Sequence, residues 1–458
     1  MKKLNNLPEG NFLRLFFVAV SLCFVIAAPF MPDRGRMFTG LWDIMTGTCK
    51  ISTNYFALGG FAATFLNMGL VGLFCTGLVS LPGSKPNHVT TLGVLLTVGF
   101  ASWGMNILNM IPTVLGVMLY ALVKKEKLGA VSNAMLYSTG IAPLISDLLF
   151  RYPGVEFIGF NWLGLGLALL VGLVIGFFLP AGLAHAPNIH KGYDHYSAAV
   201  PIGMTAFFLR AVLYNVMLGK NPGQLGLTAM AAPNVTLQLG ANIFCIAVFA
   251  LCIVAAFLMG CKPKDYWNLM KDSGHGVCFT TKYGYAPFLM NVGVFGLMII
   301  GYFNLAGVID GKDVWTGMTF GIVFCMLATC NSGSHPGNVW PIMAGYMITS
   351  LLFGGIFKLL NPGETFALTI GNQSILIGLC YANGLSPVAG KYGFGYGILA
   401  GGLHYLLVTA VPDMHGGFCL YNGGFTAALI CLLLVPQLEK FCKTKEERKT
   451  ARLEKVNK

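Results

Sequence analysis

The sequence has very few charged residues. Only 10% of its 458 residues are Asp, Glu, Lys or Arg, whereas a soluble domain carries about 25%. Hydrophobic residues make up 55% of the chain, and the mean hydropathy is +0.70. A membrane span needs about 20 apolar residues, so the length leaves room for about 12 to 14 spans. We therefore expect an all-α polytopic membrane protein without a large soluble domain.

The sequence also lacks the motifs of several enzyme classes. It has no Gly-x-x-x-x-Gly-Lys-Ser/Thr loop, no Gly-x-Ser-x-Gly elbow, no His-Glu-x-x-His pair and no Cys-x-x-Cys pair. Carboxylates inside the apolar runs are scarce, and Asp147 comes nearest to lying in one. Because proton relays in membranes usually use buried Asp or Glu, an antiporter driven by carboxylates is not supported. We expect no cofactor and no bound metal.

The charges that are present are mostly positive, with a formal net charge of +12. Most Lys and Arg lie at the chain ends and in short loops, which is typical of cytoplasmic loops that face anionic lipid. No RNA-binding motif accompanies them, so we expect the lipid bilayer as partner and no nucleic acid. Lys2, Lys3 and Arg14 place the N-terminus in the cytoplasm. We expect a bacterial inner-membrane protein with both termini cytoplasmic, ending in a basic tail over residues 439–458.

Fourteen apolar segments follow one another along the chain. Four of them are short or rich in glycine, and we expect that these are half-helices or re-entrant segments: 89–105, 109–123, 131–149 and 366–385. The other segments are 12–31, 57–80, 158–183, 199–217, 239–260, 284–306, 315–330, 339–358, 395–413 and 418–436.

The second half of the chain repeats patterns of the first in the same order, which indicates duplication into repeats 1–225 and 226–438. Because seven spans per half is an odd number, the second repeat would enter the membrane the other way up, as in many secondary transporters. A miscount of one weak segment in each half would instead make the repeats parallel. The matched positions begin at Trp42 and Trp267, Asn67 and Asn291, Gly104 and Gly333, Gly140 and Gly384, and His190 and His415, with Tyr196 and Tyr421 following the last pair.

Two matched stretches read Asn-x-x-Pro-x-x-x-Gly, from Asn109 with Pro112 and from Asn338 with Pro341. Gly and Pro interrupt helices, and a helix that begins there presents free N–H groups and the positive end of its dipole. Two such ends at a shared midplane would bind an anionic or polar solute. The alternative is that both asparagines are ordinary helix caps at the mouths of short loops.

A second matched pair of interruptions lies around Thr139 and around Asn383 with Ser386, and we expect both in the neighbourhood of the same site. The polar run Asn372-Gln373-Ser374 precedes the second interruption. It forms either a loop at the membrane surface or the lining of a cavity. Asn67 and Asn291 lie inside apolar runs, where we expect interhelical hydrogen bonds rather than solute binding.

Histidines are the remaining candidates. His185, His190, Asp194 and His195 are crowded as in a metal site, but the second half has Cys419 and Leu420 at the matched positions. We therefore expect a cytoplasmic surface loop there. His404 lies inside an apolar segment and is the best single candidate for handling protons, with a fully hydrogen-bonded structural histidine as the alternative.

The duplicated Asn-x-x-Pro-x-x-x-Gly and His-x-Gly…Tyr stretches resemble an uncharacterised family of bacterial multi-pass membrane proteins that carries two copies of one domain of unknown function. This resemblance extends to about Gln437 and implies no activity, substrate or catalytic residue. The number of spans is also similar to that of nucleobase and anion carriers built from seven-plus-seven inverted repeats, whose sequence signatures are absent here.

These observations predict a secondary transporter or permease for an unidentified small polar or anionic solute. Its substrate-binding residues would be Asn109, Pro112, Thr139, Asn338, Pro341, Asn383 and Ser386, acting through backbone and side-chain amides, with no catalytic residue. The alternatives are a membrane-embedded metal-dependent enzyme that uses the histidine cluster, or a non-catalytic membrane scaffold. The sequence does not fix the oligomeric state.

Overall fold

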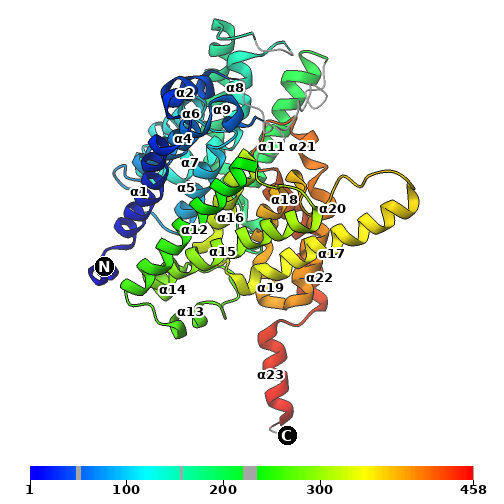
Figure 1. The fold of residues 1–458 in the computed structure, drawn as a ribbon. Coiled ribbons are helices and arrows are strands. Elements are labelled where there is room, and N and C mark those ends of the chain that lie inside the picture. Colours follow the sequence, from blue (N-terminus) through cyan, green and yellow to red (C-terminus); the bar gives the residue numbers. More distant parts are fainter. Residues whose placement is uncertain (48–52, 155–157, 220–234, 457–458) are drawn as a thin grey trace.

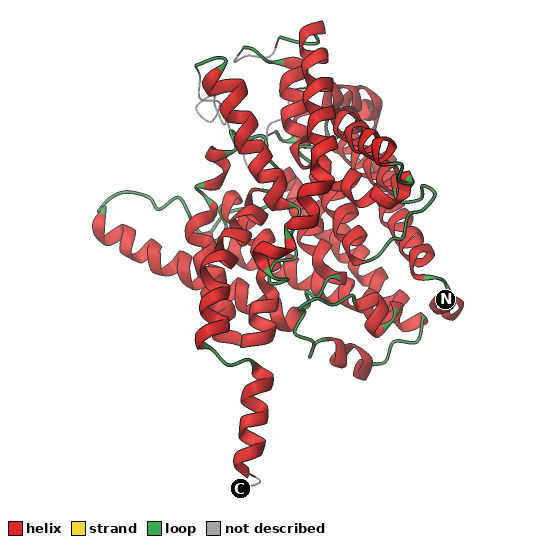
Figure 2. Ribbon diagram, turned by 180° about the vertical axis from the view of Figure 1, so that it is seen from behind, coloured by secondary structure: helices red, strands yellow, loops and turns green. Residues whose placement is uncertain are grey.

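The computed structural model describes residues 1–47, 53–154, 158–219 and 235–456, and the regular structure in these ranges is entirely helical (Figures 1 and 2). Within these ranges ten helices are long and apolar enough to cross a membrane by length and composition, and three shorter apolar helices accompany them. The chain is therefore a multi-pass helical membrane protein. The count of seven spans per repeat stays a prediction, because the shorter helices fall below the length of a span.

The helices of the first half begin near the N-terminus and end before the undescribed residues 220–234. They are η1 (Lys2–Asn6), α1 (Glu9–Ala27), η2 (Ala28–Phe30), η3 (Arg34–Arg36), α2 (Met37–Thr46), α3 (Tyr55–Leu58), α4 (Phe61–Leu78), α5 (His88–Phe100), α6 (Ile107–Lys124), η4 (Leu128–Val131), α7 (Ser132–Ser138), η5 (Thr139–Ile141), α8 (Ala142–Phe150), α9 (Trp162–His185), α10 (Pro187–His190), α11 (Ala199–Arg210) and the π-helical η6 (Ala211–Val216).

The second half repeats this order and ends in a helix that projects from the bundle in Figure 1. Its elements are α12 (Val235–Leu258), α13 (Pro263–Leu269), α14 (Phe279–Tyr283), α15 (Tyr285–Asp310), α16 (Gly317–Leu327), η8 (Ala328–Asn331), α17 (Pro336–Leu360), α18 (Gln373–Ala382), η9 (Asn383–Leu385), α19 (Ser386–Tyr392), α20 (Phe394–Val408), α21 (Val411–Met414), α22 (Asn422–Phe441) and α23 (Lys445–Val456).

The two halves pair their helices in the same way. In the first half α1 packs on α4 and α6 on α9, and in the second half α12 packs on α15 and α17 on α20. The short helices α5 and α16 pack on each other and join the halves. Their backbones touch at two glycines, since a Cβ on Gly321 would lie 2.2 Å from the carbonyl oxygen of Gly99. A residue larger than glycine would force the halves apart there.

The weak segments of the sequence form short or interrupted helices. Segment 89–105 forms only the short helix α5, and 131–149 forms α7 and α8, which are interrupted by the 3₁₀ turn η5. Segment 366–385 contains α18 and the 3₁₀ turn η9, after which α19 continues. Segment 109–123 lies in the uninterrupted α6, which is long enough to cross a membrane. The two interruptions at matched positions are where the two halves meet.

Candidate functional site

Asn109 and Asn338 are each placed at the start of a long helix by a reciprocal cap. The side chain of Asn109 accepts a hydrogen bond from the N–H of Asn106 at 3.0 Å, and that of Asn338 accepts one from the N–H of His335 at 3.0 Å. Their amide nitrogens donate to the carbonyl oxygens of Gly104 and Gly333 at 3.1 and 2.9 Å. Such bonds satisfy donors that a helix start otherwise leaves unpaired. Both amides are thus engaged within their own turns.

Pro112 and Pro341 lie inside α6 and α17 and face glycines of the neighbouring helices. A Cβ on Gly172 would lie 2.4 Å from the Cβ of Pro112, and one on Gly397 would lie 2.7 Å from the Cβ of Pro341. The absence of side chains at these glycines lets the proline rings approach α9 and α20 closely. Both prolines therefore shape the packing of the matched helix pairs.

The halves interlock through two connectors, residues 191–198 before α11 and residues 415–421 before α22. In the first connector the N–H of His195 donates to the carbonyl oxygen of Gly384 in η9, at 3.2 Å. In the second the N–H of Leu420 donates to the carbonyl oxygen of Gly140 in η5, at 2.9 Å. Each connector is therefore hydrogen-bonded through its backbone to the interrupted helix of the other repeat.

The matched residues Tyr196 and Tyr421 differ in their hydrogen bonding to the interrupted helices. The hydroxyl of Tyr196 lies 2.9 Å from Oδ1 of Asn383 and 3.1 Å from the carbonyl oxygens of Cys325 and Cys380. At the position matched to Asn383, the hydroxyl of Thr139 donates to the carbonyl oxygen of Leu136. The hydroxyl of Tyr421 is buried and has no hydrogen-bond partner among the described residues. The shorter Thr139 side chain explains this difference.

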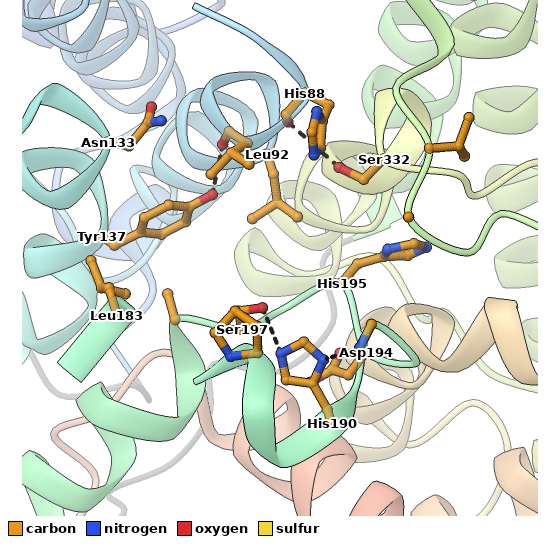
Figure 3. A pocket seen from close by; sticks show the side chains of 16 residues that line it. His88, Leu92, Asn133, Tyr137, Leu183, His190, Asp194, His195, Ser197 and Ser332 are labelled. Carbon is orange, nitrogen blue, oxygen red and sulfur yellow. Dashed lines mark hydrogen bonds between the residues drawn. The ribbon is translucent and has the colours of Figure 1, made fainter. Parts of the chain in front are cut away.

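One cavity, which we call the histidine cavity, lies against the first connector and has a volume of about 370 Å³. Its walls come from α5, α7, the end of α9, α10, the first connector, and Gly276, Val277 and Ser332 of the other repeat (Figure 3). The polar side chains that line it are His88, Asn133, Tyr137, His190, Asp194, His195, Ser197 and Ser332. No Lys or Arg is among the lining residues.

Hydrogen bonds orient the histidines of this cavity. Nδ1 of His190 accepts from the N–H of Gly192 at 3.2 Å, so its proton lies on Nε2 and points to Oγ of Ser197 at 2.6 Å (Figure 3). Nε2 of His195 lies 3.3 Å from Oγ of Ser386, which in turn lies 3.0 Å from Oγ of Ser334. Burial lowers the pKa of His195 to about 3, so this side chain is neutral.

Asp194 is the acidic residue of the histidine cavity and is only 2% exposed. Its Oδ1 accepts a hydrogen bond from the N–H of Tyr196 at 2.9 Å, whereas its Oδ2 has no partner among the described residues. Burial raises the pKa of Asp194 to about 7, because the charged carboxylate is costly away from water.

The prediction of a surface loop at residues 185–195 is correct only in part, and its cytoplasmic location is not tested. His190 and Asp194 are buried, whereas His185, Pro187, Asn188 and Lys191 are exposed. The connector is held inside because it bonds to η9 of the other repeat. Within the described ranges no group of three or more His, Cys, Asp or Glu is placed to hold a metal ion.

A second cavity of about 380 Å³ lies against the second connector, and we call it the Trp103 cavity. It is lined by α18, the end of α20, α21, the connector and the residue Trp103 of the first repeat. Asn372 and Ser374 line it, so the polar run before the second interruption lines a cavity, as one of the two sequence alternatives held.

The two cavities are built from matched positions of the two repeats. Val89 and Met318 are the second residues of α5 and α16, and Tyr137 and Tyr381 precede Gly140 and Gly384 by the same number of residues. Each cavity also takes residues from the opposite repeat: Gly276, Val277 and Ser332 line the histidine cavity, and Trp103 lines the other. Further matched pairs that line the two cavities are Leu183 and Val408, Pro187 and Pro412, Asp194 and Cys419, His195 and Leu420, and Ser197 and Asn422.

A layer of aromatic rings separates the cavities. Tyr196, between two lining residues of the histidine cavity, packs against Tyr381 of the Trp103 cavity with ring centroids 5.0 Å apart. Phe100 packs against Tyr381 and Tyr421, at 6.4 and 5.7 Å. A solute that passes from one cavity to the other would have to displace these rings.

His404 lies in α20 and lines neither cavity. Its Nδ1 lies 2.6 Å from the hydroxyl of Tyr346, and its Nε2 lies 2.9 Å from the carbonyl oxygen of Gly423. A neutral imidazole that donates from Nε2 and accepts at Nδ1 satisfies both contacts. The geometry is that of a structural histidine, and its proposed part in proton handling stays untested.

None of the seven predicted substrate-binding residues lines either cavity. Asn383 and Ser386 come nearest, because they contact Tyr196 and His195 of the first connector. The remaining five lie in caps, turns and helix contacts. The sequence singled out His190, Asp194 and His195 only as a stretch resembling a metal site, and it gave no signal for the other lining residues of the connectors, although the matched positions of Tyr196 and Tyr421 mark where both connectors lie.

Comparison with known proteins identifies two copies of one domain. The model of a family described as "Protein of unknown function (DUF1576)" matches residues 33–215 and again residues 234–440. This double match confirms the internal repeat and the predicted resemblance. No curated protein and no solved structure matches the chain.

Proposed function

The chain belongs to the DUF1576 family, and we propose that it is a secondary transporter for a small polar or anionic solute, working by alternating access between its two cavities. The observation that carries the proposal is that matched positions of the two repeats line both cavities. In transporters with internal repeats, exchange of the two conformations between the repeats opens the site first to one side and then to the other.

The positions of matched elements support inverted repeats. α2 and α13, which carry the matched residues Trp42 and Trp267, lie at the top and at the bottom of Figure 1. The histidine cavity takes Gly276 from the loop after α13, whereas the Trp103 cavity takes Pro412 from α21 on the upper side. In this proposal the cavities open toward opposite faces, and the face with α23 and α13 is assigned to the cytoplasm of an inner membrane.

The seven residues predicted from the sequence act in this proposal as the framework of the site. Asn109 and Asn338 fix the starts of α6 and α17, and Asn383 and Ser386 hold the first connector. The solute itself would contact the cavity linings. Their Asn, Ser and Tyr side chains and neutral histidines offer hydrogen bonds to a polar solute without requiring an ion pair.

Filling each cavity in turn tests the proposal. Small polar and anionic solutes are first screened for raising the melting temperature of the purified protein, since a ligand stabilises the state it binds. Uptake of a stabilising solute into proteoliposomes is then compared for Leu183→Trp, which fills the histidine cavity, and Val408→Trp, which fills the Trp103 cavity. Leu170→Trp is the matched control, because Leu170 lies on the surface of α9 and is 59% exposed.

Alternating access predicts that both filled variants lose uptake and that Leu170→Trp retains it. Uptake that survives in either filled variant would contradict the proposal, because both cavities must open in every cycle. The absence of any stabilising or transported solute across a broad panel would favour a scaffold instead.

A further inference from the structure

We propose that Asp194 is the proton-binding group of this protein and that its protonation state controls the histidine cavity. Resting on the proposed function, this assigns the proton as the coupling ion. The proton-binding step itself is independent of transport, since it needs only a carboxyl group that exchanges a proton with water in the cavity.

The two carboxylate oxygens of Asp194 have different surroundings. Oδ1 is fixed by the N–H of Tyr196, and a Cβ on Gly384 would lie 2.5 Å from it, so the carboxyl group is pressed against η9 of the other repeat. Oδ2 is buried, lacks a partner among the described residues and belongs to a residue that lines the cavity. A buried acceptor without a donor is costly when it is charged, and protonation removes that cost.

Among the described residues, no Lys or Arg lines the cavity beside Asp194. The titratable groups that line the cavity with Asp194 are His88, His190, His195 and Tyr137, while Tyr196 and Cys431 lie close enough to interact with its charge. The nearby Lys191 instead pairs with Glu439 at 2.6 Å. The environment therefore favours a neutral carboxyl group, and burial raises the pKa of Asp194 to about 7.

The other cavity provides an internal comparison. The position matched to Asp194 is Cys419, and the position matched to His195 is Leu420. The acid that lines the Trp103 cavity, Asp413, is exposed, so of these two lining acids only Asp194 is buried. Asp194 can take up its proton from the histidine cavity, and coupling requires that the exchange of conformations then exposes it to the other side for release.

The proposed step is the reversible protonation of one carboxylate. The carboxylate of Asp194 takes a proton from water in the histidine cavity and becomes a neutral acid, and after the two repeats exchange conformations it releases the proton to water on the other side. An anionic solute can then occupy the cavity beside the neutral acid, whereas the carboxylate would repel it. This predicts that solute and proton move together.

The first experiment uses the wild-type protein and needs no solute. Purified protein in nanodiscs is treated with dicyclohexylcarbodiimide, which reacts with protonated carboxyl groups in apolar sites, at pH values below and above about 7. Modified residues are then mapped by mass spectrometry. We expect strong modification of Asp194 on the acidic side, several-fold weaker modification on the alkaline side, and little modification of the exposed Asp413 in the Trp103 cavity at either pH.

The second experiment follows the infrared band of protonated carboxyl groups during a pH titration. Asp194→Asn should remove a band that titrates near neutral pH, and Asp413→Asn should leave it unchanged. Equal modification of Asp194 at both pH values, or a neutral-pH band that persists in Asp194→Asn, would overturn the assignment. Neither readout depends on transport. Uptake by a protein whose Asp194 does not titrate would retain the proposed function and refute only the proton site.

Discussion

Asn67 and Asn291 make the same pair of hydrogen bonds in the two repeats. The amide of Asn67 donates to the carbonyl oxygens of Ala101 and Met105 at 2.7 and 2.9 Å, and that of Asn291 donates to those of Cys330 and Ser334, both at 2.9 Å. All four acceptors lie where a short helix, α5 or α16, gives way to a turn. The two asparagines thus tie α4 and α15 to the matched short helices, which confirms the predicted interhelical bonds.

Removing either amide should destabilise the protein. Asn67→Ala and Asn291→Ala each leave two buried carbonyl oxygens without a donor, which costs roughly 2–4 kcal/mol in free energy of unfolding. We expect a clear fall in melting temperature for both variants. Asn188→Ala, at an exposed position on α10, is the control and should melt with the wild type. A similar fall in the control would show that the assay does not report these bonds.

The matched tyrosines should respond in opposite ways to loss of the hydroxyl. Tyr196→Phe removes a donor that lies near three acceptors and should cost about 1–3 kcal/mol in stability. Tyr421→Phe removes a buried hydroxyl that has no partner among the described residues, so it should be neutral or stabilising. Thermal unfolding of the two variants measures the difference. Equal losses would mean that the hydroxyl of Tyr421 is hydrogen-bonded in the membrane.

Asp194 should make stability depend on pH. Folding raises its pKa from 3.8 to about 7, so between these values the folded state binds more protons than the unfolded state. Its contribution to stability is therefore fully present below pH 4 and is lost as the pH rises toward 7, by on the order of 4 kcal/mol in total. The wild type should lose stability over this range relative to Asp194→Asn. A constant difference between the two melting curves would contradict the raised pKa.

The contact between connector and interrupted helix should not tolerate a side chain at Gly384. An added Cβ there would lie 2.5 Å from Oδ1 of Asp194 and 2.6 Å from the ring of Tyr196. Gly384→Ala should therefore destabilise the protein by about 1–3 kcal/mol through overpacking. Gly395→Ala in α20, where an added Cβ meets nothing within 4 Å, should instead be neutral or slightly stabilising. Unfolding in a mild denaturant measures both.

Much of the fold could be predicted from the sequence because its signals are local. Long apolar runs identify spans, and glycine and proline near Gly104, Gly140, Gly333 and Gly384 mark where helices are interrupted. The duplication can be recognised in the sequence because the matched residues are those that fix the backbone at the interruptions. The positions of the short helices α5 and α16 in the bundle were harder to predict, since they depend on contacts between the halves rather than on the lengths of the helices.

The candidate site could be predicted only in part, because its walls come from distant segments. The sequence predicts a surface loop around His190, Asp194 and His195, because the second half has Cys419 and Leu420 at the matched positions. His190 and Asp194 are nevertheless buried, because the N–H of His195 bonds to Gly384 of the other repeat. Such a partner leaves no local trace in the sequence. Asn109 and Asn338 were conspicuous for the opposite reason, because capping imposes a short and recognisable pattern.

Labelling two matched positions tests the central claim most directly. Ser197→Cys places a thiol in the histidine cavity, and Asn422→Cys places one at the matched position of the Trp103 cavity. An impermeant thiol reagent is applied to intact cells and to inside-out vesicles, with the parent protein as the control for native cysteines. We predict that Asn422→Cys is labelled in cells and Ser197→Cys only in inside-out vesicles. Labelling of both from the same side would contradict inverted repeats and alternating access.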